Sequence, residues 1–288
     1  MSPVKTVLAA VGAAFIAIML LSVTIAYLTG SALTGGDKVA VVRMDGVITD
    51  PTETVKQLKG LGKRKDVKAV VVRINSPGGA VGPSQEIYRE IQKLKEKKPV
   101  VASMGAIAAS GGFYAAVAAD KIVALPGTIT GSIGVIIEFM NAEELLSKIG
   151  LKGYVVKSGK FKDVGSPLRR MEPAERELMQ SVIDDVNRQF IEAVAKGRNM
   201  DAGRVEKMAD GRIFTGAQAL ANGLIDSLGG LSDAISLGAQ MAGIEGEPEV
   251  IYVERRDLSL WNAVLGEGVS RITDIISGTR LMYMTTNP

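Results

Sequence analysis

Short apolar stretches rich in β-branched residues alternate along this chain with amphipathic stretches. The stretch "KAVVVRIN" at 68–75 is almost continuously apolar, which is typical of a parallel strand covered on both faces. It is followed by "SQEIYREIQKLKEKK", where Ile87, Ile91 and Leu94 recur on one helical face. The same alternation predicts strands in "KVAVVRMDGVI", "PVVASM", "KIVALP", "GSIGVII" (131–137) and "KGYVVKSG" (152–159), and helices in "TETVKQLKGL" and "NAEELLSKIG". Such strand–helix–strand units predict an α/β fold with right-handed crossovers.

The amino-terminal region has a different character, because residues 6–31 include no charged residue. About 20 apolar residues span a bilayer, whereas the apolar core of a cleavable signal peptide has roughly 7–15. We therefore predict a single transmembrane anchor over residues 6–31, in preference to a buried helix or a cleaved signal. Lys5 before this run favours a cytoplasmic amino terminus, with the rest of the chain on the extracytoplasmic side of the cell membrane.

From Glu172 onward the pattern becomes helical. Apolar residues recur every four positions, which predicts a long amphipathic helix that starts near Pro173; they are Leu178, Val182, Val186, Phe190 and Val194. Shorter helices are expected in "DAGRVEKMAD", "TGAQALANGL" and "LSDAISLGAQMAG", and a strand in "EVIYVE".

The predicted organisation has three parts. An anchor and linker occupy residues 1–36, one main domain occupies 37–245, and a carboxy-terminal strand, helix and tail occupy 246–288. The tail "RLMYMTTNP" is extended enough to reach a groove, although a frayed terminus is the simpler expectation.

Composition narrows the possible chemistry. The 288 residues include no histidine and no cysteine, which excludes a Ser-His-Asp triad within one chain, a thiol nucleophile and the usual zinc-hydrolase ligand sets. The net charge of +3 is too small to indicate a nucleic-acid partner. No cofactor or metal is predicted.

The stretch "MGAIAASGGFYAA" places Ser110 between an apolar strand and two glycines. A serine in this position commonly caps the following helix. If it is instead a nucleophile it needs a base, and without histidine the remaining bases are Asp, Glu or a neutral lysine. A lysine becomes a base when its surroundings lower its pKa toward the working pH.

A second loop, "INSPGG" at 74–79, also leaves a buried strand. Glycines at a strand end allow positive φ and expose backbone N–H groups, which an oxyanion hole requires, although an ordinary turn has the same composition. Neither loop has the spacing of a phosphate-binding loop. Because both loops follow parallel-type strands, we expect them to open at one edge of one sheet.

Four motifs in order, "INSPGG", "SMGAIAASGGFYAAVAAD", "TGSIGV" and "VKSGKFKDVGSP", resemble the signal peptide peptidase family of membrane-anchored serine proteases, in its short bacterial form. The resemblance covers about residues 38–245. It implies a fold of the Clp protease and crotonase type, with repeated β-β-α units. It also implies a homo-oligomer in which neighbouring protomers share each site, and peptide substrates such as signal peptide remnants.

The resemblance also implies roles for individual residues. The nucleophile falls on Ser110, the lysine base on Lys162, and a serine that orients the lysine on Ser132. The oxyanion donors fall on the backbone N–H of Gly111 and of the "SPGG" loop, where Gly79 is favoured over Gly78.

The lysine assignment depends on a short polar segment that also contains Lys157 and Lys160. The position after the aromatic residue and before "DVGSP" selects Lys162, with Lys160 as the fallback. Asp163 lies next to it and would oppose the required lowering of the lysine pKa, unless its side chain points away.

Three alternatives remain open from the sequence. A crotonase-like acyl-CoA enzyme has a related architecture and a two-amide oxyanion hole. A catalytically inactive membrane scaffold would keep the fold without the reaction. A membrane protease family associated with stomatin has a similar serine motif.

Overall fold

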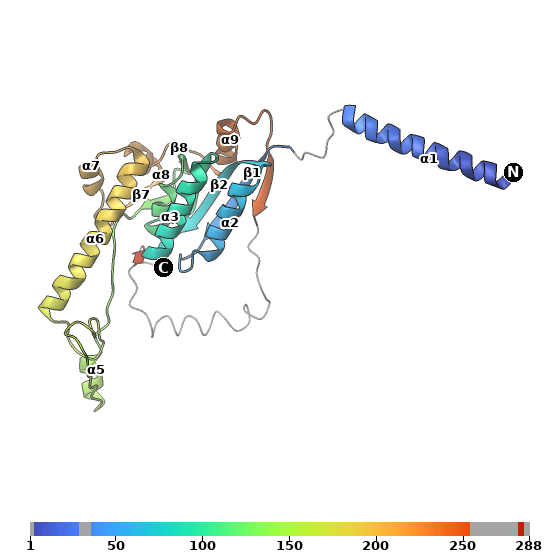
Figure 1. The fold of residues 1–288 in the computed structure, drawn as a ribbon. Coiled ribbons are helices and arrows are strands. Elements are labelled where there is room, and N and C mark those ends of the chain that lie inside the picture. The colour runs from blue at the N-terminus through green and yellow to red at the C-terminus, as the bar shows by residue number, and fades with distance from the viewer. Residues whose placement is uncertain (1–2, 29–35, 254–281, 285–288) are drawn as a thin grey trace. The chain divides into compact units, whose positions relative to one another are not determined.

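A computed structural model describes residues 3–28, 36–253 and 282–284 (Figure 1). The chain divides into two compact units, Met1–Asp37 and Lys38–Pro288. The first contains one helix, α1 (Pro3–Leu28). A search of the described residues finds no helix that is both long and apolar enough to cross a membrane. The anchor over residues 6–31 therefore stays a prediction.

The second unit alternates strands and helices, as the sequence predicts. Its strands are β1 (Lys38–Asp45), β2 (Val67–Ser76), β3 (Gly78–Ala80), β4 (Val100–Ala109), β5 (Lys121–Ala124), β6 (Ile129–Gly131), β7 (Ile213–Thr215), β8 (Ser227–Leu228), β9 (Glu249–Val253) and β10 (Met282–Met284). Its helices are α2 (Thr52–Lys63), α3 (Val81–Lys95), α4 (Gly111–Ala116), α5 (Glu143–Lys148), α6 (Pro173–Arg198), α7 (Ala202–Glu206), α8 (Gly216–Ala221) and α9 (Leu231–Met241).

Eight of the described strands form one sheet, in the order β7-β6-β4-β2-β1-β9, with β5 beside β4 and β8 beside β5. All of its pairs are parallel except β6 with β7. The predicted α/β class and parallel central strands are thereby confirmed. Because the strands run in parallel, the ends of β2, β4 and β6 lie at the same edge, where the two glycine loops begin.

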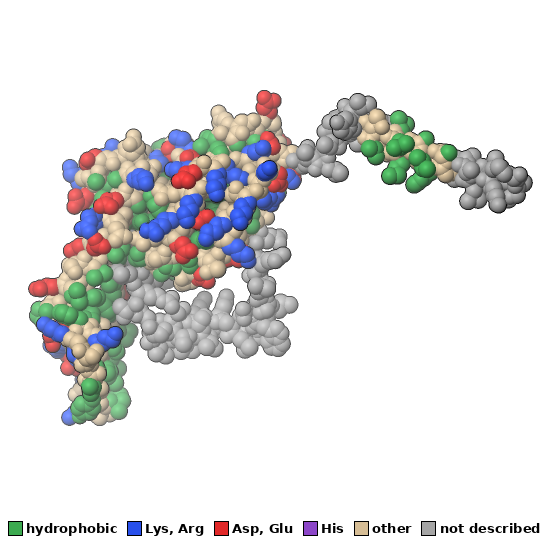
Figure 2. Space-filling model, viewed as in Figure 1, with side chains coloured by type: hydrophobic (Ala, Val, Ile, Leu, Met, Phe, Trp, Pro, Cys, Tyr) green, Lys and Arg blue, Asp and Glu red, His purple; other side chains and the backbone are tan. Residues whose placement is uncertain are grey.

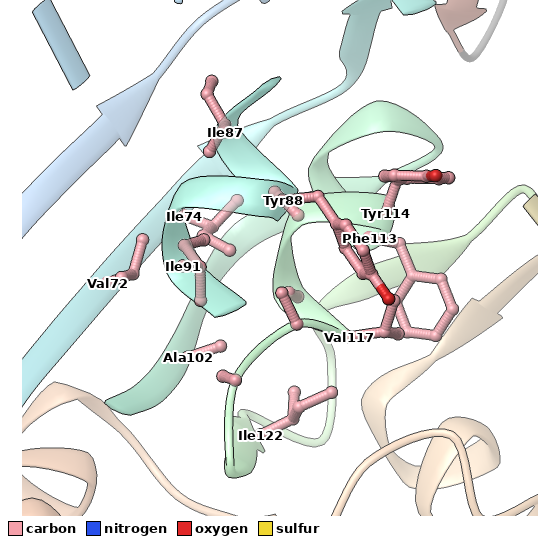
Figure 3. Close-up of a cluster of buried hydrophobic side chains, with 14 of the residues drawn as sticks. Val72, Ile74, Ile87, Tyr88, Ile91, Ala102, Phe113, Tyr114, Val117 and Ile122 are labelled. Atoms are coloured by element: carbon pink, nitrogen blue, oxygen red, sulfur yellow. The ribbon is translucent and has the colours of Figure 1, made fainter. Parts of the chain in front are cut away.

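Helices cover both faces of this sheet, which explains why its strands are apolar at consecutive positions. Val71 of β2 is fully buried in a cluster with Ile235 of α9. Its neighbour Val72 is fully buried on the opposite face with Ile91 of α3, as Figure 3 shows. Burying such a side chain stabilises the fold by roughly 1.5–3 kcal/mol, so this pattern determines which strands lie at the centre.

Two predicted strands differ from the structure. The strand predicted at 131–137 is instead β6, which ends at Gly131 because Gly131 and Ser132 both take positive φ, at 77° and 51°. The strand predicted at 152–159 does not form, and Tyr154 in it is 87% exposed. A β-branched run becomes a strand only where a neighbouring strand accepts its hydrogen bonds, and none of the described strands lies beside it.

The carboxy-terminal expectations have mixed outcomes. The strand in "EVIYVE" is confirmed as β9, which pairs with β1. The helix predicted within 246–288 lies outside the described residues. The frayed terminus is wrong for residues 282–284, which form β10 and pair antiparallel with β3.

The short helix α4 is fixed by aromatic contacts from two other helices. Tyr114 of α4 lies 4.9 Å from Tyr88 of α3 and 5.0 Å from Phe190 of α6, measured between ring centroids. Phe113 is fully buried beside them (Figure 3). These contacts hold the first turn of α4, and therefore the residue immediately before it, in a defined place.

Candidate active site

Ser110 lies between the end of β4 and the start of α4, with φ 53° and ψ −118°. A non-glycine residue rarely takes a positive φ, and such strain is typical of functional positions. The flanking backbone stabilises this turn, because the Ser110 N–H donates to the Gly131 carbonyl over 2.8 Å and the Tyr114 N–H donates to the Ser110 carbonyl over 2.8 Å.

Among the described residues, the hydroxyl of Ser110 makes no hydrogen bond that would stabilise the fold. The residue occupies the position before α4, yet its side chain makes no capping hydrogen bond, so the helix-cap alternative is wrong. The side chain is 1% exposed, and Oγ is buried without a hydrogen-bond partner among the described residues. A buried polar atom without a partner costs about 1–3 kcal/mol, which favours a role in binding or catalysis.

Ser132 lies directly beside Ser110. The strands β4 and β6 pair in parallel with Ala109 opposite Gly131, so each serine follows the end of one of two adjacent strands. Ser132 also takes a positive φ, 51°, and its N–H donates to the Arg212 carbonyl over 2.9 Å. The structure thus places Ser110 and Ser132 at neighbouring strand ends, and the predicted role of Ser132 toward the lysine stays a prediction.

The glycine loop forms the short strand β3 close to the same edge. The Gly78 N–H is occupied, because it donates to Ser76 Oγ over 3.1 Å. Ile48 bonds to the residues on either side of Gly79, since the Ile48 N–H donates to the Gly78 carbonyl and the Ala80 N–H donates to the Ile48 carbonyl. In a ladder of this kind the intervening residue directs its own N–H to the opposite side.

The N–H of Gly79 therefore faces away from Ile48, toward the side of β3 where β10 pairs with it. Gly111 is the first residue of α4, so its N–H is one of the helix donors that have no partner within the helix. This geometry disfavours Gly78 and leaves the Gly111 N–H as a candidate donor, whereas the Gly79 N–H is directed at Tyr283 of β10, the segment that occupies this edge. The role of Gly111 and Gly79 in an oxyanion hole stays a prediction.

Ser76 is a residue of this edge that the sequence interpretation missed. It is fully buried at the end of β2, and its hydroxyl accepts the Gly78 N–H that begins the glycine turn. A serine that precedes Pro-Gly commonly stabilises a turn in this way, and this signal was present in "INSPGG".

Replacing Gly79 by alanine is expected to impair the site more than the fold. A Cβ at Gly79 would lie 2.2 Å from the Ile48 carbonyl oxygen, so β3 must shift and the Gly79 N–H must move with it. Loss of one oxyanion donor lowers kcat by about 10²–10³-fold. Gly82→Ala is the matched control, because no atom lies within 4 Å of its new Cβ. Peptidase rates and Tm measured for both variants test this, and a Gly79→Ala variant with the parent's rate contradicts it.

Lys162 lies elsewhere in the structure. It is exposed, in a series of turns after Gly159, and its own N–H donates to the Gly159 carbonyl over 3.1 Å. Because Ser110 Oγ has no hydrogen-bond partner among the described residues, Lys162 of the same chain does not contact it. The structure therefore does not bring together the two residues that the sequence pairs.

Lys162 belongs to what we name the projecting segment, residues 136–171. Figure 1 shows this segment, with α5, at the end of α6 that extends away from the sheet. Many of its large apolar side chains are exposed, and hydrophobic atoms gather there in Figure 2; they include Met140, Leu145, Ile149, Leu151, Tyr154 and Val156. An exposed apolar surface of this kind is typical of a protein–protein contact.

The helix α6 shows the same change along its length. Its predicted start at Pro173 is confirmed, with a capping box between Glu172 and Glu175. Of its apolar stripe, Phe190 and Val194 are fully buried against the main body, whereas Leu178 and Val182 are only partly buried. The amino-terminal half of α6 therefore has an apolar face that its own chain leaves partly open.

Comparison with known proteins identifies the family. The family model of peptidase family S49 matches residues 92–245, which is more than half of the chain. The chain belongs to peptidase family S49. The Clp protease model matches residues 38–130, in agreement with the parallel sheet.

Several relatives of this S49 chain carry peptidase names. It is 47% identical over 210 residues to a putative protease of Synechocystis sp., covering 72% of this chain and 76% of the relative. It is 34% identical over 265 residues to a putative protease of Methanocaldococcus jannaschii, covering 85% of both chains. It is 39% identical over 212 residues to a putative signal peptide peptidase of Enterococcus faecium, covering 69% of this chain but only 62% of that protein.

One solved structure is similar in fold. A membrane-bound stomatin-specific protease superimposes with a TM-score of 0.52 at 19% identity, covering 77% of this chain and 99% of that one. At this identity the similarity concerns the fold alone. The family match and these relatives identify the chain as a serine peptidase. The crotonase-like acyl-CoA alternative is therefore wrong.

Proposed function

We propose that this S49 peptidase is a membrane-anchored endopeptidase that cleaves signal peptide remnants and other hydrophobic peptides through a Ser110/Lys162 dyad. The observation that carries the proposal is the Ser110 hydroxyl, which is buried at a strained strand end and lacks any hydrogen-bond partner among the described residues. A serine needs an adjacent base to act as a nucleophile, and the chain has no histidine to supply one.

In the proposed mechanism the neutral amine of Lys162 removes the proton from Ser110 as Oγ attacks the peptide carbonyl. The N–H groups of Gly111 and Gly79 stabilise the oxyanion, and Lys162 then donates the proton to the leaving amine. Water, activated by the same lysine, hydrolyses the acyl-enzyme. Ser132 orients the lysine amine toward Ser110, which is the task of the third group in a triad.

Two features near Ser110 support a peptide substrate that includes apolar side chains. The edge of β3 already accepts an extended segment of this chain, β10, with Tyr283 opposite Gly79. A substrate that adds to an edge strand in this way gains main-chain hydrogen bonds regardless of its sequence. A cavity of about 420 Å³ also opens beside Ser132, and its lining combines apolar side chains such as Val135 and Ile183 with acidic ones such as Asp184.

We also propose that neighbouring protomers share each site, with Lys162 of one reaching Ser110 of the next. Three observations support this arrangement: Ser110 Oγ has no partner within the part of the chain that the structure describes, the projecting segment exposes apolar side chains, and α6 leaves half of its apolar stripe partly open. A second copy that covers these surfaces would bury them and complete the site.

The proposed location is the extracytoplasmic side of the cell membrane, with residues 6–31 as the anchor. The uncharged run and Lys5 before it support this orientation. Protease treatment of intact cells that express the full chain tests it, because digestion of the main domain is expected from outside and not from the cytoplasm.

The experiment that tests the proposed reaction uses the full chain in detergent micelles. It is incubated with a signal-peptide-like peptide that has an apolar core, and with a charged peptide of equal length. We expect cleavage of the apolar peptide at a rate at least tenfold higher, and labelling of Ser110 by a fluorophosphonate probe. An intact assembly that cleaves neither peptide and leaves Ser110 unlabelled would contradict the proposal and favour the inactive scaffold.

A further inference from the structure

The turn that carries Lys162 is held by one arginine, Arg169. The guanidinium of Arg169 donates to both oxygens of Asp163, from Nε over 2.9 Å and from Nη2 over 2.8 Å. Its Nη1 also donates to Glu175 Oε2 over 2.8 Å, and its Nη2 bonds to Glu175 Oε1. Arg169 therefore links the residue next to Lys162 with the first turn of α6.

The Glu175 end of this link is rigid. The Glu175 side chain is 1% exposed, and it also accepts the Glu172 N–H over 2.9 Å as part of the capping box. The bonds from Arg169 and then from Glu172 lower the pKa of the Glu175 carboxyl to about 2. The carboxylate thus stays charged at all working pH values, and Arg169 has a fixed buried partner.

The Asp163 carboxylate is engaged by two cations other than Lys162. Besides Arg169, it accepts a hydrogen bond from Lys157 Nζ. Bonding to Arg169 first, and then to Lys157, lowers the pKa of Asp163 well below its usual range. Within the described residues, Lys162 Nζ has no ion pair with Asp163 or with any other carboxylate.

We propose that Arg169 is a positioning residue for the lysine base: it fixes the turn that presents Lys162 and keeps the Asp163 carboxylate turned away from the Lys162 amine. The inference rests on the proposed Ser110/Lys162 reaction. A carboxylate close to a lysine stabilises the ammonium form, and a base must be neutral. Sequestering Asp163 therefore favours the reactive form of Lys162.

Three other carboxylates lie in the projecting segment, and two of them have partners, whereas the exposed Glu138 is far from Lys162 along the chain and has no ion pair among the described residues. Glu143 accepts the Arg170 N–H, and Glu144 is paired with the Arg170 guanidinium. Lys160 is a cation, and its Nζ lies over the Phe161 ring, 5.3 Å from the centroid. Asp163 is therefore the carboxylate whose release would act most directly on Lys162.

The test is the pH dependence of kcat/KM in the full-chain assembly, with the variants Arg169→Gln, Asp163→Asn and the two combined. In Arg169→Gln the Asp163 carboxylate keeps only Lys157 as a partner and is held less tightly, so it stabilises the Lys162 ammonium. We therefore expect the acidic limb of the pH profile to move up by about one pH unit. At pH values below the pKa of the base, kcat/KM of Arg169→Gln is then about tenfold lower than that of the parent, and it reaches the parent's value at high pH. The double variant is expected to return the limb to the parent position, and Asp163→Asn alone is expected not to raise it.

Arg170→Gln is the matched control, because it removes the neighbouring guanidinium, whose side chain is 77% exposed, from its pair with Glu144. We expect no movement of the limb. Since Arg169→Gln leaves buried Glu175 unpaired, Tm is measured for every variant. Arg169→Lys keeps the positive charge but not the bidentate contact. It is expected to shift the acidic limb less than Arg169→Gln does, and it provides a variant in which Glu175 still has a cationic partner.

If Arg169→Gln lowers kcat/KM by the same factor at every pH, Arg169 has only a structural role and the inference is wrong. The same would follow if the double variant kept the shifted limb. Failure of the proposed Ser110/Lys162 reaction can be distinguished from failure of this inference, because the reaction is wrong only if Lys162→Ala keeps the parent's rate. If Lys162→Ala is inactive while the limb of Arg169→Gln is unmoved, only the inference fails.

Discussion

Replacing Ser110 by alanine is expected to lower kcat by at least about 10³-fold while leaving the fold intact, because removal of a serine nucleophile leaves only binding and oxyanion stabilisation. The stability expectation is equally specific. Since the Ser110 Oγ is buried and none of the residues that the structure describes bonds to it, its removal also removes a desolvation cost, so Tm is expected to stay constant or to rise.

The measurement is peptide cleavage together with Tm for the Ser110→Ala assembly. Ser181→Ala is the control, because Ser181 is an exposed serine on α6 whose hydroxyl donates to the Leu178 carbonyl. It is expected to match the parent in both measurements. If Ser110→Ala still cleaves the peptide, another residue is the nucleophile. A large drop in Tm would instead show that Ser110 stabilises the fold through contacts other than hydrogen bonds.

The second large effect is expected for Lys162→Ala. Loss of a general base lowers the rate by about 10²–10⁴-fold. Lys162 is exposed and has no ion pair among the described residues, so its removal is expected to change the stability of the chain by no more than about 0.5 kcal/mol.

Two nearby lysines separate the base from a general effect of charge. Lys160→Ala is expected to keep most of the rate, because its ammonium lies over the Phe161 ring. Lys157→Ala removes one of the partners of Asp163 and is expected to have a smaller effect than Lys162→Ala. If Lys160→Ala were inactive and Lys162→Ala active, the base would be Lys160.

The central strands were predictable from the sequence because a strand that is buried on both faces is a run of consecutive apolar residues. Consecutive valines such as Val71 and Val72 contact different helix layers, so a strand at the centre must be apolar at every position. The same reasoning located the edge of the sheet where Ser110 and the glycine loop meet, since parallel strands end together.

The projecting segment was not predictable in the same way. The stretch at 152–159 has the composition of a strand, but strand formation depends on a neighbour, and local sequence does not reveal whether one is present. The separation of Lys162 from Ser110 within one chain has the same origin, because spacing along the sequence does not determine where a segment without a neighbouring strand lies.

Arg169 illustrates a further limit. Its role depends on a contact with Glu175 that forms only when the first turn of α6 is in place, and nothing in the local sequence distinguishes it from its neighbour Arg170. The sequence does show that Asp163 lies next to Lys162, where its carboxylate would oppose the neutral form of the lysine. The structure shows which cations engage that carboxylate instead.

The most direct test of the shared site is co-assembly of the two inactive variants. Ser110→Ala and Lys162→Ala chains are co-expressed with different affinity tags, and assemblies that contain both are isolated by two successive purifications. If each site combines Ser110 of one protomer with Lys162 of its neighbour, random mixing restores about one quarter of the parent's activity, since one site in four then holds both intact residues. Mixed assemblies that stay as inactive as either variant alone would contradict the shared site.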